Sequence, residues 1–295
     1  MAITLHNPYA NLSGGRWLRG NLHTHTTASD GKRPHQEVID DYAARGYGFL
    51  MISDHDVYTG PEDYAKFDSR GMVLIPGNEV TARGPHLLHV NADRRIAPYG
   101  LRQGVINQIN RTQGFCIVNH PNWAKNFDHC SALRMNEWMD YVGVEIFNGV
   151  CLRQEGSAYA LGKWDIVLND CRQIWGFAND DSHWAEGDVE LGWNVAYVKE
   201  KSVAGVCAAL KAGQFYPSTG IVITSIEVEG NRVRVVTENA TRMVALRELG
   251  RRIAVVDDKA IEFTAPDDAT YVRVECLGDR EKFAWTQPFF NAAVI

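Results

Sequence analysis

The sequence predicts an α/β fold, with a (β/α) barrel over residues 1–215 and a small antiparallel all-β domain over residues 216–295. Three observations predict it. Apolar runs typical of strands alternate with stretches of helical spacing, which favours parallel strands with right-handed crossovers. Several of these runs end in polar residues, as strands do at the catalytic face of a barrel. From residue 221 onward, alternating β-branched stretches are split by turns, with no helix expected.

The first expected strand, residues 16–25, ends in two histidines. Successive side chains of a strand point to opposite faces, so His23 and His25 share one face while Thr24 is turned away. Two imidazoles on one face are a ready pair of nitrogen ligands for a divalent ion. The alternative is a pair of hydrogen-bonded histidines at a strand end. A helix over residues 35–48 follows.

The other elements of the expected barrel continue the alternation, with seven strands as an alternative to the usual eight. Cys116 lies in one of the apolar runs and is expected to pack as a small hydrophobic residue. The later strands are expected at residues 49–56, 73–81, 86–92, 115–123, 144–149 and 174–184, with helices at 101–114, 133–143 and 157–173. In the second domain, residues 223–240, 251–278 and 282–290 predict a sheet or sandwich packed on the barrel.

Composition and charge limit the class of protein. The 295 residues are 45% hydrophobic and 22% charged, as in an ordinary globular protein. A net charge of −6 argues against a broad nucleic-acid footprint, although bound cations could still favour an anionic substrate. The six cysteines contain no CxxC pair, so neither a disulfide framework nor a zinc ribbon is expected. With neither a signal peptide nor a membrane span in the pattern, a cytoplasmic protein is predicted.

Nine histidines and carboxylates lie at or just beyond the expected strand ends. Gathered in one cleft, such groups would be costly without compensating charge, which metal ions supply. Mixed imidazole and carboxylate ligands suit Zn, Mn or Fe, and nine ligands exceed the need of one tetrahedral ion. The sequence therefore predicts two or three divalent ions held by His23, His25, Asp30, His55, Glu79, His86, His120, Asp181 and His183.

The motifs around these residues resemble those of the PHP (polymerase and histidinol phosphatase) superfamily. They read NLHTHTTASDG, FLMISDHD, PGNEV, HLLHVN, VNHPN and NDDSH. More narrowly, GNLHTHTTASDG together with AWTQPFF near the end of the chain resembles the branch that includes carbaryl-hydrolase-like metallohydrolases. The resemblance implies a distorted (β/α)7 TIM-like barrel that holds two or three metals.

The resemblance also implies a role for each ligand. His23 and His25 match the HxH motif, and Asp30 matches the aspartate that follows it. His55 matches the TDH-type histidine, and Glu79 matches the bridging glutamate. The remaining matches are His86 at the start of an HLLGY-like strand, His120 in the NHP motif, and Asp181 with His183 in the closing DxH pair.

This sequence departs from the family pattern at two places. His89 stands where a glycine is usual, which makes it a rival of His86. We favour His86 because it opens the strand at the matching place, and the three-residue offset puts the two on opposite faces. The acid is doubled at Asp180 and Asp181, and the DxH spacing selects Asp181, which leaves Asp180 as a supporting or solvated residue.

Other polar residues are weaker candidates. Asn148 ends an expected strand and is a candidate for substrate contact or for support of the ligands. Asn122 and Trp123 could line the cleft, the alternative being turn formation and packing. Arg83 and Arg153 could meet an anionic group, although lone arginines are usually solvated. Two histidines in polar surroundings are expected at the surface, namely His35 and His129.

The function predicted is metal-dependent hydrolysis. A metal-bound hydroxide would attack phosphorus or a carbonyl carbon, and no side chain is assigned as the catalytic group. The resemblance favours a phosphoester, with a carbamate, ester or amide as the alternative substrate bond. A third reading is a non-catalytic regulatory module. The expected partner is a small anionic substrate, with no nucleic acid and no membrane, and self-association stays open.

Overall fold

Strands and helices are interspersed along the chain from Arg16 to Asn179, which confirms the mixed α/β class. The computed structural model describes residues 3–98, 100–184 and 186–294. The elements in this part are β2 (Arg16–Asn21), α1 (His35–Ala44), β3 (Phe49–Leu50), α2 (Pro61–Tyr64), β4 (Val73–Leu74), β5 (Gly77–Val80), β6 (Leu87–Val90), α3 (Arg102–Ile109), β7 (Phe115–Val118), α4 (Ala132–Glu137), β8 (Gly143–Asn148), α5 (Leu161–Leu168) and β9 (Trp175–Asn179).

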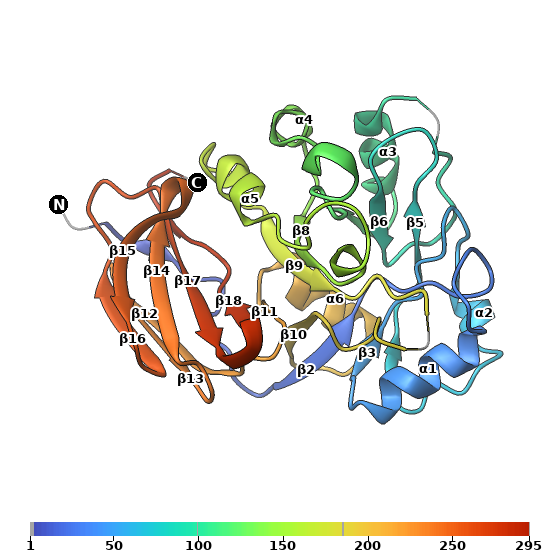
Figure 1. Ribbon diagram of the computed structural model, residues 1–295, viewed down its shortest axis with the longest axis horizontal. Coiled ribbons are helices and arrows are strands. Elements are labelled where there is room, and N and C mark those ends of the chain that lie inside the picture. The colour runs from blue at the N-terminus through green and yellow to red at the C-terminus, as the bar shows by residue number, and fades with distance from the viewer. Residues whose placement is uncertain (1–2, 99, 185, 295) are drawn as a thin grey trace.

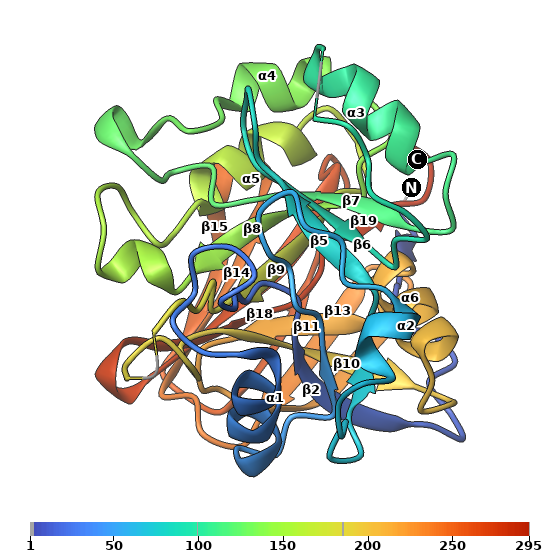
Figure 2. The same cartoon turned by 90° about the vertical axis from the view of Figure 1, so that its right-hand side faces the viewer.

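Two groups of strands carry the polar ends. One sheet has the order β5-β6-β7-β8-β9, and β2, β3 and β4 run parallel in another. Single bridges connect the two groups, from His55 to Glu79 and from Thr24 to Ser182. In Figure 2, these strands lie between α1 at the bottom and α3 and α4 at the top. Residues that are far apart in the chain therefore come together where these bridges connect the two groups of strands.

Strand β6 differs from the sequence-based expectation of parallel strands. It is antiparallel to both β5 and β7, whereas β7, β8 and β9 are parallel. The physical reason is the short connection from β5 to β6, residues 81–86, because a parallel crossover needs a dozen residues or more. The reversal puts the start of β6 at the edge where the neighbouring strands end.

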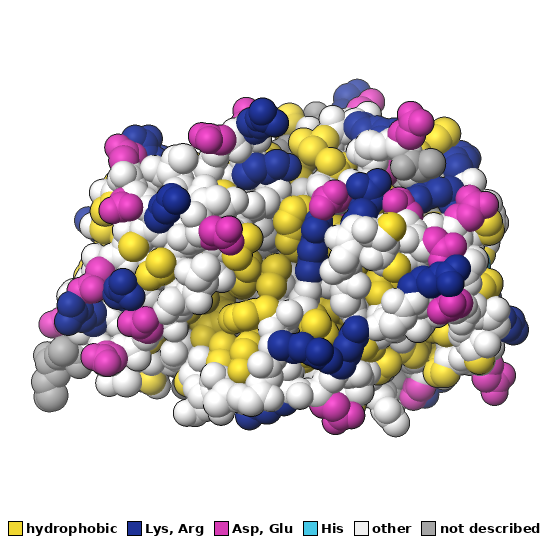
Figure 3. Space-filling model, turned by 90° about the horizontal axis from the view of Figure 1, so that it is seen from below, with side chains coloured by type: hydrophobic (Ala, Val, Ile, Leu, Met, Phe, Trp, Pro, Cys, Tyr) yellow, Lys and Arg dark blue, Asp and Glu magenta, His cyan; other side chains and the backbone are white. Residues whose placement is uncertain are grey.

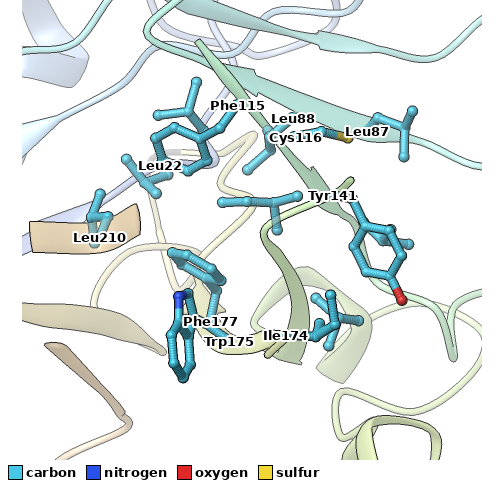
Figure 4. Packing of buried hydrophobic residues seen from close by; sticks show 14 of the residues in the cluster. Leu22, Leu87, Leu88, Phe115, Cys116, Tyr141, Ile174, Trp175, Phe177 and Leu210 are labelled. Carbon is cyan, nitrogen blue, oxygen red and sulfur yellow. The ribbon is translucent and has the colours of Figure 1, made fainter. Parts of the chain in front are cut away.

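The main apolar core lies among these strands and the helices around them. Figure 4 shows Leu22, Leu88, Phe115 and Phe177, from separate strands or strand ends, gathered in one cluster. All four residues of β7 are buried, which explains its continuous apolar run. Cys116 is fully buried there, as predicted. Packing on both faces fixes the strands whose ends carry the polar residues.

The elements that follow β9 bring the chain back to pair with β2. The elements β10 (Trp193–Val198), α6 (Val203–Lys211) and β11 (Phe215–Ser218) were not individually predicted. Strand β10 is antiparallel to both β2 and β11, and β11 also pairs with β18. An eleven-stranded sheet therefore continues past residue 215. The domain division at that residue stays a prediction.

The remaining strands gather on the left of Figure 1, where orange and red ribbons lie together. Between residues 221 and 294 the structure has strands and short 3-10 turns but no α-helix, as the sequence indicates. The strands are β1 (Leu5–His6), β12 (Ile223–Glu229), β13 (Arg232–Thr237), β14 (Arg242–Arg247), β15 (Arg251–Val256), β16 (Ala260–Thr264), β17 (Tyr271–Gly278), β18 (Lys282–Trp285) and β19 (Phe289–Asn291). Strands β12, β13 and β16 form a separate sheet.

A buried ion pair connects this group of strands to α5. The Arg273 guanidinium donates to both carboxylate oxygens of Asp165, at 2.9 and 2.7 Å, and the Tyr271 hydroxyl donates to the same carboxylate at 2.8 Å. Arg273 is 1% exposed and Asp165 is 4% exposed. The Arg273 guanidinium also pairs with Glu275 at 2.7 Å, so a small buried network of charges connects β17 to α5.

The surface carries charges of both signs. Figure 3 shows them interspersed on the face seen from below, around a hydrophobic hollow near its middle. In the described ranges, the helices are too short or too polar to cross a lipid bilayer.

Candidate metal centre

The nine predicted ligands converge at the edge where the strands end. His23, His25 and Asp30 follow β2, and Glu79 lies in β5. His55 comes after β3, His120 after β7, and Asp181 and His183 after β9. His86 immediately precedes β6, and the antiparallel direction of that strand brings it to the same edge. Six of the nine line a hollow of about 90 Å³, namely Asp30, His55, His86, His120, Asp181 and His183.

Glu79 lies at the middle of the cluster and is fully buried. Its Oε1 atom is 3.3 Å from His23 Nε2, 3.1 Å from His86 Nδ1 and 3.3 Å from His120 Nε2. Its Oε2 atom is 2.7 Å from His55 Nδ1 and 3.7 Å from His25 Nε2. The two carboxylate oxygens therefore face two different sets of imidazoles.

Asp181 is the second buried carboxylate of the cluster. Its Oδ1 atom is 3.2 Å from His23 Nε2 and 3.1 Å from His25 Nε2. The backbone at Asp181 is left-handed, with φ of 55°, and its N–H donates to the His23 carbonyl at 2.9 Å. This backbone contact keeps the carboxylate beside the two histidines that share a face after β2.

Asp30 lies at the rim, with 53% of its side chain exposed. Its oxygens are 3.5 Å from His55 Nε2 and 3.4 Å from His183 Nε2. The turn that carries it is held by buried Asp54, whose carboxylate accepts from Thr26 N at 2.8 Å and from the Ser29 hydroxyl at 2.6 Å. Asp30 is thus the most accessible of the candidate ligands that the structure brings together.

The charges of these groups are strongly coupled. Burial opposes the charged form of His23, but Asp181, Glu145 and Glu79 raise its pKa well above the ordinary value. Burial likewise opposes ionisation of Glu79, whereas His86 and His23 hold its pKa well below the usual range. For His55, Asp30 and Glu79 outweigh burial and raise the pKa to about 10. For His25 and His86, in contrast, burial outweighs the carboxylates and lowers the pKa. The cluster therefore favours positive charge at His23 and His55 but not at every imidazole.

Several buried atoms of the cluster make no aligned hydrogen bond with the described residues. They are His23 Nε2, both ring nitrogens of His25, His55 Nδ1, Glu79 Oε2, His120 Nδ1 and Asp181 Oδ1. His55 Nδ1 and Glu79 Oε2 illustrate the point, since they are 2.7 Å apart without hydrogen-bond alignment. Buried polar atoms are normally paired, so this group has the character of an ion-binding donor set.

Glu145 in β8 holds residues of the cluster by hydrogen bonds and was not among the predicted site residues. Its carboxylate accepts from His23 Nδ1 at 2.8 Å and from the His120 backbone N–H at 2.8 Å. It also accepts from Asn148 Nδ2 at 2.9 Å and from Asn179 Nδ2 at 2.8 Å. A carboxylate on one ring nitrogen turns the other toward a metal, and His23 Nε2 indeed points to Glu79 and Asp181.

The two rival histidines of β6 lie in different surroundings. His86 faces Glu79, whereas His89 is fully buried on the other side and its Nε2 lies 3.0 Å from the Thr112 hydroxyl. Burial lowers the pKa of His89 to about 4. The structure thus brings His86, and not His89, to the cluster.

His129 is not the surface residue that was predicted. The His86 backbone N–H donates to its Nε2 at 2.9 Å, and its ring lies 4.9 Å from that of His120. Its segment folds back because the Lys163 ammonium donates to three carbonyls of residues 121–130, each at 2.8 Å. His35 is also partly buried, with its ring stacked on Phe67 at 5.1 Å.

Asn148 and Asp180 lie on opposite sides of Asp181. The Asn148 amide donates to Asp181 Oδ2 at 3.1 Å, so it supports the ligand cluster. The Asp180 carboxylate instead accepts from Tyr42 at 2.9 Å and from the backbone of Leu191 at 2.7 Å. Burial raises the pKa of Asp180 to about 6. Asp180 therefore orders the segment after β9 and faces away from the cluster.

The other predicted substrate contacts lie outside the hollow lined by the histidines. The Asn122 amide donates to the Tyr159 carbonyl at 2.7 Å. Arg153 pairs with Asp188, which in turn accepts from the His183 backbone N–H at 3.1 Å. Arg83 lines a separate hollow of about 470 Å³. Direct substrate contact by these three residues stays a prediction.

Comparison with known proteins gives short sequence matches and a structural match that covers nearly the whole chain. No protein-family model matches. The chain is 34% identical over 80 residues to a 5'-3' exoribonuclease from Haemophilus influenzae, covering 25% of this chain and 29% of that protein. It is 39% identical over 72 residues to a 3',5'-nucleoside bisphosphate phosphatase from Chromobacterium violaceum, covering 24% and 25%. The chain thus spans about a quarter of the length of these relatives.

A solved structure from Bacteroides vulgatus shares the fold. It is described as a two-domain protein containing a predicted PHP-like metal-dependent phosphoesterase. The match covers 98% of this chain and 90% of that one, with a TM-score of 0.58 and 15% identity. This likeness shows that the two chains share a fold, and the narrower resemblance to the carbaryl-hydrolase-like branch stays a prediction.

Proposed function

Because the chain has a PHP-like fold, we propose that it is a metal-dependent hydrolase that cleaves phosphoesters. The observation that carries the proposal is the position of Glu79. A fully buried carboxylate directs one oxygen to His23, His86 and His120, and the other to His25 and His55. This is the arrangement expected of a carboxylate that bridges two ions.

The donor set divides into overlapping groups. Within each group, one ligand atom per residue lies within 4.8 Å of the others. His23, His25 and Asp181 form one group, and His55, Glu79 and His86 form a second. A third group consists of His25, Asp30, His55 and His183. A fourth group consists of His23, Glu79 and His120, and a fifth of His86, His120 and His129. Because Glu79, His25 and His55 each belong to two of these groups, the donor set supports two or three ions, and Zn, Mn and Fe suit the donors.

The spacing of the donor atoms fits this proposal. Metal bonds of about 2.1 Å at octahedral or tetrahedral angles separate neighbouring ligand atoms by about 3.0–3.4 Å. The Asp181 Oδ1 atom is 3.2 and 3.1 Å from the two histidines after β2. Glu79 Oε1 keeps 3.1–3.3 Å from its three imidazoles. These distances suit ligands converging on shared ions.

Each part of the machinery has a distinct task. Divalent ions, when bound, would lower the pKa of a bound water toward about 7 and would place positive charge beside phosphoryl oxygens. Glu145 holds His23 with Nε2 directed into the site, and Asn148 holds Asp181. Asp54 orders the turn that presents Asp30 at the mouth. This preorganisation limits the rearrangement needed when substrate binds.

A phosphoester is favoured by the names of the relatives and of the Bacteroides protein, all of which concern phosphate esters. One observation keeps a carbamate, ester or amide bond as the second candidate. The described residues that line the hollow include neither lysine nor arginine. Cationic side chains commonly bind phosphate, and here that charge would have to come from the ions.

The finer description of the fold belongs to the same proposal. We propose that β2, β3, β5, β6, β7, β8 and β9 form a distorted seven-stranded barrel. The bridges His55–Glu79 and Thr24–Ser182 support it, since they connect the two groups of strands on both sides. In such a barrel the cluster would occupy the catalytic end.

A hydrolysis screen with metal analysis tests the function. The purified protein is assayed for bound metals and then against phosphomonoesters, phosphodiesters, carbamates and carboxylic esters. We expect phosphate release that stops on chelation. Metal-dependent cleavage confined to carbamates or esters would select the second candidate. Absence of both bound metal and turnover would refute the proposal.

A further inference from the structure

The hollow at the metal centre has one uncharged side, formed by Trp123, Val150 and Gln154. We refer to these three residues as the Trp123 wall. The rest of the lining consists of imidazoles and carboxylates, including Asp30, which supply the charge. The wall supplies an indole, an aliphatic side chain and a neutral amide.

Two loops build the wall and are fastened to each other. Trp123 belongs to the segment after β7, and Gln154 to the segment after β8. The indole N–H of Trp123 donates to Gln154 Oε1 at 2.9 Å, and Trp123 forms an antiparallel bridge with Gly156. At Gly156, with φ of +112°, a Cβ atom would lie 2.2 Å from the Asn122 carbonyl oxygen. Only glycine permits this approach, so the loops form one surface.

The Trp123 ring lies next to the metal-binding imidazoles. Its centroid is 5.1 Å from that of His120 and 5.5 Å from that of His86. A phosphoryl group held at the ions would therefore place its alcohol substituent against the indole. The basic side chains Arg83, Arg102 and Arg134 line a different hollow.

We infer that the Trp123 wall selects the leaving group, favouring phosphate monoesters of aromatic or planar uncharged alcohols over esters that carry a second phosphate. The inference rests on the proposed function and adds the substrate class. An indole face offers ring stacking to such a group. A second phosphate at the same place would meet no cationic partner in the described lining of the hollow.

Binding measurements test the wall without requiring turnover. Benzylphosphonate and ethylphosphonate carry the same anionic head, so the ratio of their Kd values on the metal-bearing protein reports the wall. We expect benzylphosphonate to bind about fivefold to tenfold more tightly, the range of one good ring contact. Trp123→Leu should abolish this preference and Trp123→Phe should keep it. The comparison variant Trp184→Leu, at a tryptophan outside the lining, should leave it intact.

Steady-state kinetics test how a second phosphate on the substrate changes turnover. Adenosine 3'-monophosphate and adenosine 3',5'-bisphosphate carry the same 3'-phosphate and differ only in the leaving alcohol, which is adenosine for the first and adenosine 5'-monophosphate for the second. We expect kcat/KM for release of the 3'-phosphate to be at least as high for the monophosphate. A tenfold preference for the bisphosphate would overturn the inference and assign the substituent to the arginine-lined hollow. Equal Kd values for the two phosphonates, or loss of selectivity only in Trp184→Leu, would also overturn it.

The two proposals can fail separately. Selective binding of benzylphosphonate without hydrolysis of any phosphate would refute the proposed function and leave the wall standing. Hydrolysis of phosphates with no dependence on Trp123 would refute the wall alone. Failure of the metal-bearing protein to bind either phosphonate would refute both.

Discussion

Replacing Glu79 by glutamine probes the bridging role directly, because it keeps the size of the side chain and removes its charge. Ions held among the surrounding imidazoles would lie within about 4 Å of the carboxylate. At an effective dielectric constant of about 20, one unit of ion charge at that distance gains about 4 kcal/mol from the carboxylate. Loss of that attraction weakens an ion's Kd by about a thousandfold. An ion bound at micromolar Kd would then dissociate during dialysis.

The assay is metal content per chain by mass spectrometry, with steady-state kinetics on the same dialysed samples. We expect Glu79→Gln to hold at least one ion fewer than the wild type, and to lose far more in kcat than in substrate affinity. Asp165→Asn is the matched control, since Asp165 is also a buried carboxylate but pairs with Arg273 away from the cluster. A Glu79→Gln protein with the full number of ions would refute the reasoning.

Three further predictions concern ligand choice, pH and stability. His86→Ala should lose metal whereas His89→Ala should retain it, as measured by metal content; the reverse result would mean that the wrong histidine is assigned to the site. His89 has a folded pKa of about 4, below its unfolded value, so it contributes stability that is present above about pH 6.5 and lost as pH falls toward 4. The loss amounts to roughly 3 kcal/mol in the free energy of unfolding, measured by urea unfolding across this pH range, and should be absent in His89→Gln. Identical pH profiles for the wild type and His89→Gln would contradict this prediction. Asp165→Ala should lower the free energy of unfolding by about 2–3 kcal/mol, because the buried Arg273 guanidinium loses its two bonds to Asp165 and keeps only the one to Glu275. A change below about 1 kcal/mol in the same assay would contradict the role of this contact.

The local part of the candidate site was readable from the sequence. The spacing of two residues predicted that His23 and His25 lie together, and both reach the cluster from the segment after β2 rather than from the strand itself. Strand ends bring Glu79 and His120 to the same edge. These features follow from short-range geometry, so spacing alone carries them. The offset of three between His86 and His89 separated that pair for the same reason.

Residues positioned by distant contacts were missed. His129 joins the cluster because Lys163, 34 residues further along the chain, holds the carbonyls of the intervening loop. Glu145 was visible as an acid within an apolar strand, yet its partners His23 and Asn179 come from other strands. An acid inside a buried strand is a usable signal, because such a group must be paired.

Two features of the fold separate what was predicted from what was not. Alternation of apolar and helical segments predicted the α/β class correctly. It missed the reversed direction of β6, although the six-residue connection 81–86 is too short for a parallel crossover. The eleven-stranded sheet that continues past residue 215 depends on the pairing of β11 with β10 and β18, which no local pattern reports.

The proposed hydrolysis requires several ions that act together in one site. It is tested most directly by titrating divalent metal into chelated protein and measuring phosphate release against ions bound per chain. We expect little turnover at one ion per chain and full turnover at two or three. Full turnover with a single bound ion, or in metal-free protein, would contradict it.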